Sequence, residues 1–273
     1  MSIINTNLSS LNAQRNLTKS GNELSTSMQR LSSGLRVNSA KDDAAGMSIA
    51  TKMDSQIRGM SQASRNANDG ISMIQTADGA LSNISDALQR MRELAVQGAN
   101  ETNGTQEWEN INSEISTLNT EIGRIATDTK FNGVALLTSD EVVKQIQVGA
   151  DSGQKIDVTF GSNAAYAAVD DADVTVTDAA SAADAIKNID DALEALNKER
   201  ASLGTAQNRM GYAISNLATS VENQSAAKSR ITDTDYAAET SKLSRAQILQ
   251  QAGTAMLAQA NSAPNNVMSL LRG

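Results

Sequence analysis

The chain lacks cysteine and histidine altogether, and its 273 residues include a single proline. Without thiol or imidazole side chains it has no disulfide framework and no Ser-His-Asp, Cys-His or His-zinc arrangement. A Walker loop is also missing, because no Gly-Lys-Ser/Thr follows a glycine at the required distance. We therefore expect no enzyme, with no catalytic, cofactor-binding or metal-binding residues and no cofactor.

Positive charge is scarce too: the chain has 23 Lys and Arg but 31 Asp and Glu, which gives a net charge of −8. The basic residues are spread singly, whereas nucleic-acid binding needs them clustered, so we expect no nucleic-acid partner. No run of about 18 apolar residues would span a bilayer, so we expect no membrane insertion. Residues 1–18 lack the charged and apolar regions of a cleavable signal, which taken alone predicts a cytoplasmic protein.

Aromatic residues make up only 2% of the chain, with one Trp. Leu, Ile, Val and Phe together number 53, just under a fifth of all residues. A thick single core is therefore not expected, although the length alone would allow one or two domains. Burial must come from thin rods that pack lengthwise, within the chain and between chains.

The apolar residues that are present recur at alternating steps of three and four. This spacing is typical of one face of a long helix that needs a partner surface along its length. Segments rich in Asn, Ser, Asp or Gly interrupt it at 37–46, 98–104 and 232–235. Pro264 is predicted to interrupt or bend the last helix close to its end. Helices are predicted over about 4–37, 57–98, 111–125, 182–227 and 236–271, with the helical conformation restarting near Ala44.

The middle of the chain departs from the helical rhythm. Phe131-Asn132-Gly133 is a turn signal, and segments rich in β-branched residues follow it at 142–148, 155–160 and 174–177. The order of elements is the same when read from either end, so the two terminal segments should pair. We predict a mainly α fold in which long paired N- and C-terminal helices form a coiled-coil-like rod bundle, with a small antiparallel β element at the distal middle.

Several ordered blocks resemble bacterial flagellin, the subunit of the flagellar filament, over nearly the whole chain. In the N-terminal half the blocks are Ile4-Asn5-Thr6-Asn7-Leu8, Gln29-Arg30-Leu31-Ser32-Ser33-Gly34-Leu35-Arg36-Val37-Asn38, Ala40-Lys41-Asp42-Asp43-Ala44-Ala45-Gly46, Asp69-Gly70-Ile71-Ser72-Met73-Ile74-Gln75-Thr76-Ala77-Asp78-Gly79-Ala80-Leu81 and Arg92-Glu93-Leu94-Ala95-Val96-Gln97. In the C-terminal half they are Leu203-Gly204-Thr205-Ala206-Gln207-Asn208-Arg209, Ala255-Met256-Leu257-Ala258-Gln259-Ala260-Asn261 and Leu270-Leu271-Arg272. The chain is thus similar to a short flagellin without large outer domains.

The resemblance implies a division into an inner helical domain and a surrounding rod domain. Residues 1–43 and 233–273 would supply the two parts of the inner domain. Residues 44–181 would form the N-terminal part of the rod domain, including a small β region at about 132–180. Residues 182–232 would form its C-terminal part.

The resemblance also implies a location and a set of partners. Flagellins are exported unfolded through the flagellum's own channel, guided by an uncleaved N-terminal segment, and they end in the extracellular flagellum. The expected partners are other flagellin subunits in a homopolymer, an export chaperone that holds the C-terminal helix, and the hook-junction and cap proteins. An adaptor at the hook-filament junction, which shares such terminal helices but does not form long filaments, is the second hypothesis.

Narrow apolar stripes at the two ends are the predicted self-assembly surface. A purely intramolecular core is the alternative interpretation of these stripes. The candidate assembly residues are Leu24, Met28, Leu31, Leu35, Leu249, Met256 and Leu257.

Two candidate recognition sites for host receptors follow from the resemblance alone. A patch that is expected to be exposed on the monomer resembles the family's motif for Toll-like receptor 5; its alternative role is filament packing. The C-terminal Val267, Leu270 and Leu271 resemble the part that inflammasome receptors sense inside cells. The residues of the patch are Gln89, Arg90, Arg92, Glu93, Leu94, Gln97 and Glu114.

Overall fold

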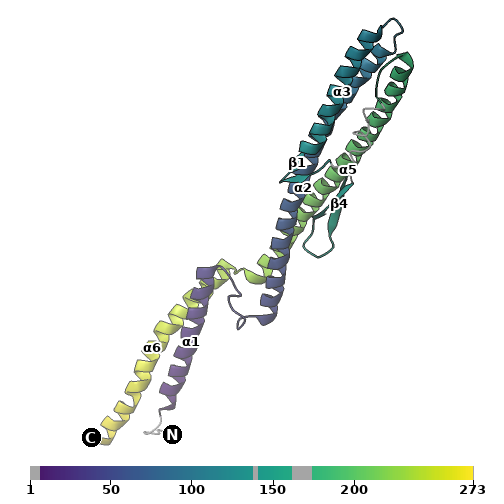
Figure 1. Cartoon of the computed structure of the whole chain (residues 1–273). Coiled ribbons are helices and arrows are strands. Elements are labelled where there is room, and N and C mark those ends of the chain that lie inside the picture. Colours follow the sequence, from purple (N-terminus) through teal and green to yellow (C-terminus); the bar gives the residue numbers. More distant parts are fainter. Residues whose placement is uncertain (1–6, 138–140, 162–173, 273) are drawn as a thin grey trace. The chain divides into compact units, whose positions relative to one another are not determined.

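The computed structural model describes residues 7–137, 141–161 and 174–272, with the backbone alone for 263–272. The chain forms two units, Met1–Ser55 with Asn223–Gly273, and Gln56–Glu222. Figure 1 shows long helices throughout, with short strands near the middle of the sequence. The helices are α1 (Leu8–Ser33), α2 (Ala44–Gly98), α3 (Thr105–Asp128), α5 (Ala179–Thr232) and α6 (Tyr236–Arg272), and the strands are β1 (Lys130–Phe131), β2 (Val134–Ala135), β3 (Val142–Gln147) and β4 (Lys155–Phe160).

In the first unit, α1 and α6 lie side by side and run antiparallel (Figure 1). Helix α1 begins after Asn7, whose side chain accepts the backbone N–H of Ser10 over 3.0 Å. It ends at Gly34, which has φ 71° in the left-handed region that glycine adopts without strain. Helix α6 begins after Asp235, whose carboxylate accepts the backbone N–H groups of Ala237 and Ala238. The paired terminal helices that the sequence predicted are therefore confirmed.

The two breaks in this unit are joined to each other by backbone hydrogen bonds. Arg36 N–H donates to the Thr232 carbonyl over 2.7 Å, and Thr234 N–H donates to the Gly34 carbonyl over 3.0 Å. Leu35 and Asp233 form an isolated antiparallel bridge between these bonds. Both breaks between helices are thus held at one level of the helix pair.

The second unit is a helical rod built from α2, α3 and α5. Each helix start has its own cap: Asp43 accepts the N–H of Gly46 before α2, Glu107 accepts the N–H of Gly104 before α3, and Asp178 accepts the N–H of Ser181 before α5. One apolar core runs along the rod and includes the fully buried Leu81, Ile84, Leu88, Met91, Ile115, Ile122, Ile189, Leu196 and Met210. The predicted spacing of three and four places these side chains on one continuous seam.

Two small antiparallel hairpins complete the rod. Strands β1 and β2 are joined by Asn132 and Gly133 with φ 50° and 78°, which is the left-handed pair of a two-residue hairpin turn. Strands β3 and β4 pair in register from Val142 with Phe160 to Gln147 with Lys155. The fully buried Phe160 anchors β4 in the rod core.

Three predicted details differ from the structure. Residues 174–177 form no strand; Val174 and Val176 are buried in the rod core from an irregular segment, and alternating valines look the same in sequence whichever way they pack. Helix α1 ends at Ser33 rather than near 37, because Gly34 terminates it. Helix α6 continues through Pro264 without interruption. Within the described residues, no helix is long and apolar enough to cross a membrane.

Candidate functional site

The candidate assembly surface lies on the α1–α6 pair, which is held together by small contacts. Leu17 packs close to Gly253, where an added Cβ would meet the Leu17 Cδ1 at 3.2 Å. Ala246 is buried in the same seam, and Ser10 Oγ donates to the Asn261 side chain over 2.7 Å. A seam of small and polar groups buries little apolar area, so much of each helix face stays open to solvent.

Six of the seven candidate assembly residues lie on this pair and Leu35 lies just after the end of α1, and the seven fall into two sets. Leu24, Leu31 and Leu257 are half-buried. Met28, Leu35, Leu249 and Met256 are exposed, with 57, 36, 48 and 66% of their surface accessible. The exposed set is not part of an intramolecular core, so the purely intramolecular interpretation does not hold for those four side chains.

A hollow of about 570 Å³ adjoins two of the exposed side chains, Leu249 and Met256. Small and polar residues of α1 form its other wall, among them Asn12, Ala13 and Asn16. Such a hollow has room for side chains of another helix, and its apolar side gives them a surface to bury.

A buried carboxylate lies at the other end of the seam. Glu239 is only 3% exposed and accepts hydrogen bonds from Ser27 Oγ over 2.7 Å and from Lys242 Nζ over 3.0 Å. Burial alone would raise the pKa of Glu239, but these two hydrogen bonds and the charges of Lys242 and Arg30 outweigh it, so the pKa is lowered. Glu239 is therefore a charged cross-link between α1 and α6.

The candidate receptor patch centres on Arg90, which joins α2 to α3. Its guanidinium donates to Glu114 over 2.9 and 3.1 Å and to Glu93 over 3.1 Å. These hydrogen bonds raise the pKa of Arg90, so it stays charged. All three side chains remain about half exposed or more, which leaves an ordered charged surface open to a partner.

The other polar members of the patch lie around this ion pair. Arg92 turns toward α5, where it donates to Asp190 over 2.6 Å. Gln89 and Gln97 are exposed, and the Gln89 amide contacts the Ser85 hydroxyl at 3.4 Å. The structure therefore brings the charged and amide members of the predicted patch onto accessible surface.

Leu94 is the exception, because the prediction that its side chain is exposed is wrong. It is only 3% exposed and belongs to the rod core with Leu88 and Met91. The step of three from Met91 places Leu94 on the buried face of α2, whereas Arg90 and Glu93 lie on the open face. Leu94 supports the patch from below and offers a partner no surface of its own.

Some predicted residues cannot be placed, and some contacts that the structure shows were not predicted. The side chains of Val267, Leu270 and Leu271 lie outside the described residues. The contact of Asn7 with Ala260 and the buried Glu239 were not predicted, because both depend on pairing between opposite ends of the chain. Among the described residues, no group of three metal-binding side chains occurs.

The paired terminal helices and the three-helix rod define a helical structural protein whose first and last helices lie side by side. The bacterial flagellin N-terminal helical region matches residues 4–141, and the bacterial flagellin C-terminal helical region matches residues 186–271. The chain belongs to the bacterial flagellin family, a family of structural proteins, and at 273 residues it is a short form.

Similar proteins agree with this assignment over the full length. A flagellin of Halalkalibacterium halodurans is 48% identical, with 99% of this chain and all of the relative covered. A flagellin of Bacillus subtilis is 43% identical, with 98% of this chain and 99% of the relative covered. The crystal structure of Bacillus cereus flagellin superimposes with a TM-score of 0.51 at 32% identity, covering 56% of this chain and 88% of that one.

Proposed function

We propose that copies of this chain polymerise into the extracellular flagellar filament that drives swimming motility. Membership of the flagellin family supports a filament subunit. The observation that carries the proposal is the exposure of Met28, Leu249 and Met256 on the terminal helix pair and of Leu35 just after α1. Full burial of such a side chain is worth roughly 1.5–3 kcal/mol, so contacts between copies have a ready source of free energy.

The mechanism is assembly by contacts that repeat from copy to copy, among them a contact between the terminal helix pairs of different copies. Because each copy presents the same open surface beside the hollow at Leu249 and Met256, a head-to-tail contact repeats from copy to copy. A head-to-tail contact that does not close on itself gives a filament instead of a ring.

Seeded elongation distinguishes a filament subunit from the hook-junction adaptor. Purified monomer is added to short filament fragments, and length is followed by negative-stain electron microscopy. A filament subunit extends the seeds into micrometre fibres, and an adaptor leaves them at their starting length. Failure of the wild-type chain to extend any seed overturns the proposed function.

The domain division and the export route belong to the same proposal. Residues 1–43 and 233–273 form the inner helical domain, and residues 44–181 and 182–232 form the rod domain. The chain leaves the cell unfolded through the flagellar channel with the help of an export chaperone at the C-terminal helix, and it meets the hook-junction and cap proteins at the filament ends. The absence of cysteine suits this route, because no oxidative step is needed.

Recognition by Toll-like receptor 5 is a second proposed role, supported by the ordered surface around Arg90. Arg90→Ala removes the guanidinium that holds Glu93 and Glu114 in place. We expect receptor activation to fall about tenfold or more, the scale of a charged interface hot spot. Arg124→Ala is the matched control, because Arg124 is equally exposed and also pairs with two carboxylates. Equal receptor activation by Arg90→Ala and Arg124→Ala would contradict the assignment of Arg90 to the receptor contact.

For intracellular inflammasome receptors, the proposed contact is the C-terminal set Val267, Leu270 and Leu271. The support is the resemblance of this segment to the C-terminal part of flagellins that inflammasome receptors sense inside cells. Leu270→Ala with Leu271→Ala should abolish inflammasome activation by protein delivered into cells, while activation of the surface receptor persists. A double variant that still activates both receptors removes this proposal alone.

A further inference from the structure

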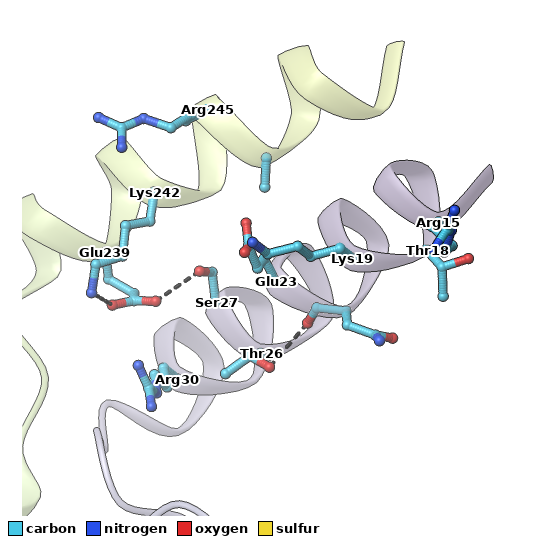
Figure 2. Close-up of a pocket in the computed structure, with 12 residues that line it drawn as sticks. Arg15, Thr18, Lys19, Glu23, Thr26, Ser27, Arg30, Glu239, Lys242 and Arg245 are labelled. Atoms are coloured by element: carbon cyan, nitrogen blue, oxygen red, sulfur yellow. Dashed lines mark hydrogen bonds and ion pairs between the residues drawn. The ribbon is translucent and has the colours of Figure 1, made fainter. Parts of the chain in front are cut away.

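The α1–α6 pair carries a second groove, which is lined mainly by charged and polar residues (Figure 2). It measures about 570 Å³ and extends along α1 from Arg15 to Arg30. At ~1.5 Å per residue this stretch is about 22 Å long, or about four helical turns. Five cations and two carboxylates line the groove, namely Arg15, Lys19, Arg30, Lys242 and Arg245 with Glu23 and Glu239.

Most of these cations have no carboxylate partner. Arg15, Lys19 and Arg245 are exposed, and none of them forms an ion pair or a side-chain hydrogen bond in the described part of the chain. The Nε of Arg30 is buried and has no acceptor. Glu239, the buried carboxylate of the groove, is already bonded to Ser27 and Lys242, as the dashed lines in Figure 2 mark.

In the second unit, by contrast, several arginines form ion pairs. Four of them pair with carboxylates of the same unit at 2.6–3.1 Å: Arg90, Arg92, Arg124 and Arg200. Most cations of the groove, however, are left without carboxylate partners among the described residues, in a chain in which acidic residues outnumber basic ones. An excess of positive charge along four turns of a helix pair fits an acidic helical face.

Charge is divided between the two units in a complementary way. The unit of Met1–Ser55 and Asn223–Gly273 contains eleven Lys and Arg against seven Asp and Glu, a net charge of +4. The unit of Gln56–Glu222 contains twelve against twenty-four, a net charge of −12. Because each copy carries both signs, a second copy supplies the acidic surface that the groove lacks.

An acidic face about 15 Å long, which covers part of the length of the groove, occurs on α5 between Asp184 and Glu194. Asp184, Asp191 and Glu194 are exposed there and form no ion pair within the described residues. Their spacing of seven and three places them on neighbouring rows of one helix side, with Lys187 between them and a net charge of −2. We propose that the cationic groove between α1 and α6 of one copy receives this α5 face of a second copy. The inference rests on the proposed polymerisation and names one of its contacts.

Charge reversal on each side tests the contact. The groove variant carries Arg15→Glu with Arg245→Glu, and the face variant carries Asp184→Lys with Asp191→Lys. We expect each to elongate seeds about tenfold more slowly than wild type at about 50 mM salt, where exposed charges are weakly screened. A chain with all four substitutions restores opposite charges across the contact and should elongate within about threefold of wild type.

The controls separate this contact from folding and from polymerisation in general. Circular dichroism of the monomers must match wild type, and Arg15→Gln with Arg245→Gln, which removes charge without reversing it, should slow elongation less than the groove variant. Lys41→Glu with Lys52→Glu makes the same net change outside the groove and should elongate as wild type does.

Two results overturn the proposed contact while leaving polymerisation intact. One is wild-type elongation by the groove variant or by the face variant. The other is a fourfold-substituted chain as slow as the single-sided variants, since the groove would then meet some other acidic surface. Failure of wild type itself to elongate would instead remove the proposed function.

Discussion

The side-chain amide of Asn7 donates a hydrogen bond of 2.7 Å to the backbone carbonyl of Ala260, joining residues 253 positions apart. Ala260 lies four residues before Pro264, which has no N–H to donate back along the helix. The proline leaves the Ala260 carbonyl without its helical partner, and Asn7 takes that place. Because Asn7 also caps α1 through Ser10, one side chain serves the ends of both terminal helices.

Asn7→Asp should loosen the first turn of α1 without removing its cap. The carboxylate still accepts from Ser10 but cannot donate to Ala260, and a lost hydrogen bond of this kind costs about 1 kcal/mol, or about a fivefold change in local opening. Hydrogen exchange followed by mass spectrometry should show that faster opening over residues 8–13. Asn7→Ala, which loses both bonds, should open further, and equal exchange in all three proteins would contradict the account.

Pro264→Ala provides the reciprocal test of the same contact. The new N–H can bond to the Ala260 carbonyl within α6, so the Asn7 amide is no longer needed there. Adding Asn7→Asp to Pro264→Ala should therefore change exchange at residues 8–13 less than Asn7→Asp does alone. Full additivity of the two changes would show that the residues act independently.

Glu239 should make the first unit sensitive to acid. Its pKa is lowered from the ordinary value of 4.5 in the folded chain, so the unfolded chain binds the proton first as pH falls. The stability that Glu239 contributes is complete above its unfolded pKa and is lost as pH falls through the lower folded value. From about pH 5 to about pH 3, wild type should lose more helicity than Glu239→Gln by circular dichroism. Parallel acid curves would count against this assignment.

Glu199 in the second unit should respond to pH with the opposite sign. Burial raises the pKa of Glu199 above its ordinary value of 4.5, although the Gly161 N–H that it accepts over 2.7 Å works against the rise. The folded chain therefore binds the proton first, and stability rises as pH falls toward 4.5. Melting followed by Trp108 fluorescence at about pH 7 and about pH 5 should show that Glu199→Gln removes this rise. A rise in stability that persists in Glu199→Gln would refute the assignment of this pH dependence to Glu199.

Leu94→Ala should act on stability and not on receptor contact. Removal of a buried leucine costs about 2–5 kcal/mol, so the variant should melt several degrees lower. At a temperature where the variant is fully folded, its receptor activation should equal that of wild type, whereas Arg90→Ala stays impaired. A folded Leu94→Ala protein that fails to activate the receptor would show that the buried position has been misjudged.

The sequence predicted those features that depend on local chemistry. Apolar spacing and its interruptions at 37–46 and 232–235 place the starts of α2 and α6, and Asn132 with Gly133 places the first hairpin turn. Spacing also predicted that the two ends pair, because each needs a partner along its length. These signals lie within a few residues of the element that they define.

Features that depend on partners distant in sequence were harder to predict. The alternation of Val174 and Val176 predicts a strand, yet both side chains enter the core of the rod from an irregular segment. Leu94 is a different case: the resemblance of its block predicted an exposed side chain, although its step of three from Met91 is a local signal for the buried face of α2. For the Asn7 contact the one sequence signal was Pro264 four residues beyond Ala260, and it does not name the donor.

In the proposed filament, side chains left open on the terminal helices become buried between copies, and methionine oxidation reports this burial. Met28 and Met256 are exposed in the single chain, whereas Met210 is fully buried and serves as the internal control. Brief treatment with hydrogen peroxide, read by mass spectrometry, should oxidise Met28 and Met256 at least about tenfold more slowly in seeded filaments than in monomer, because oxidation follows exposure. Equal oxidation rates at both methionines in monomer and filament would contradict the account.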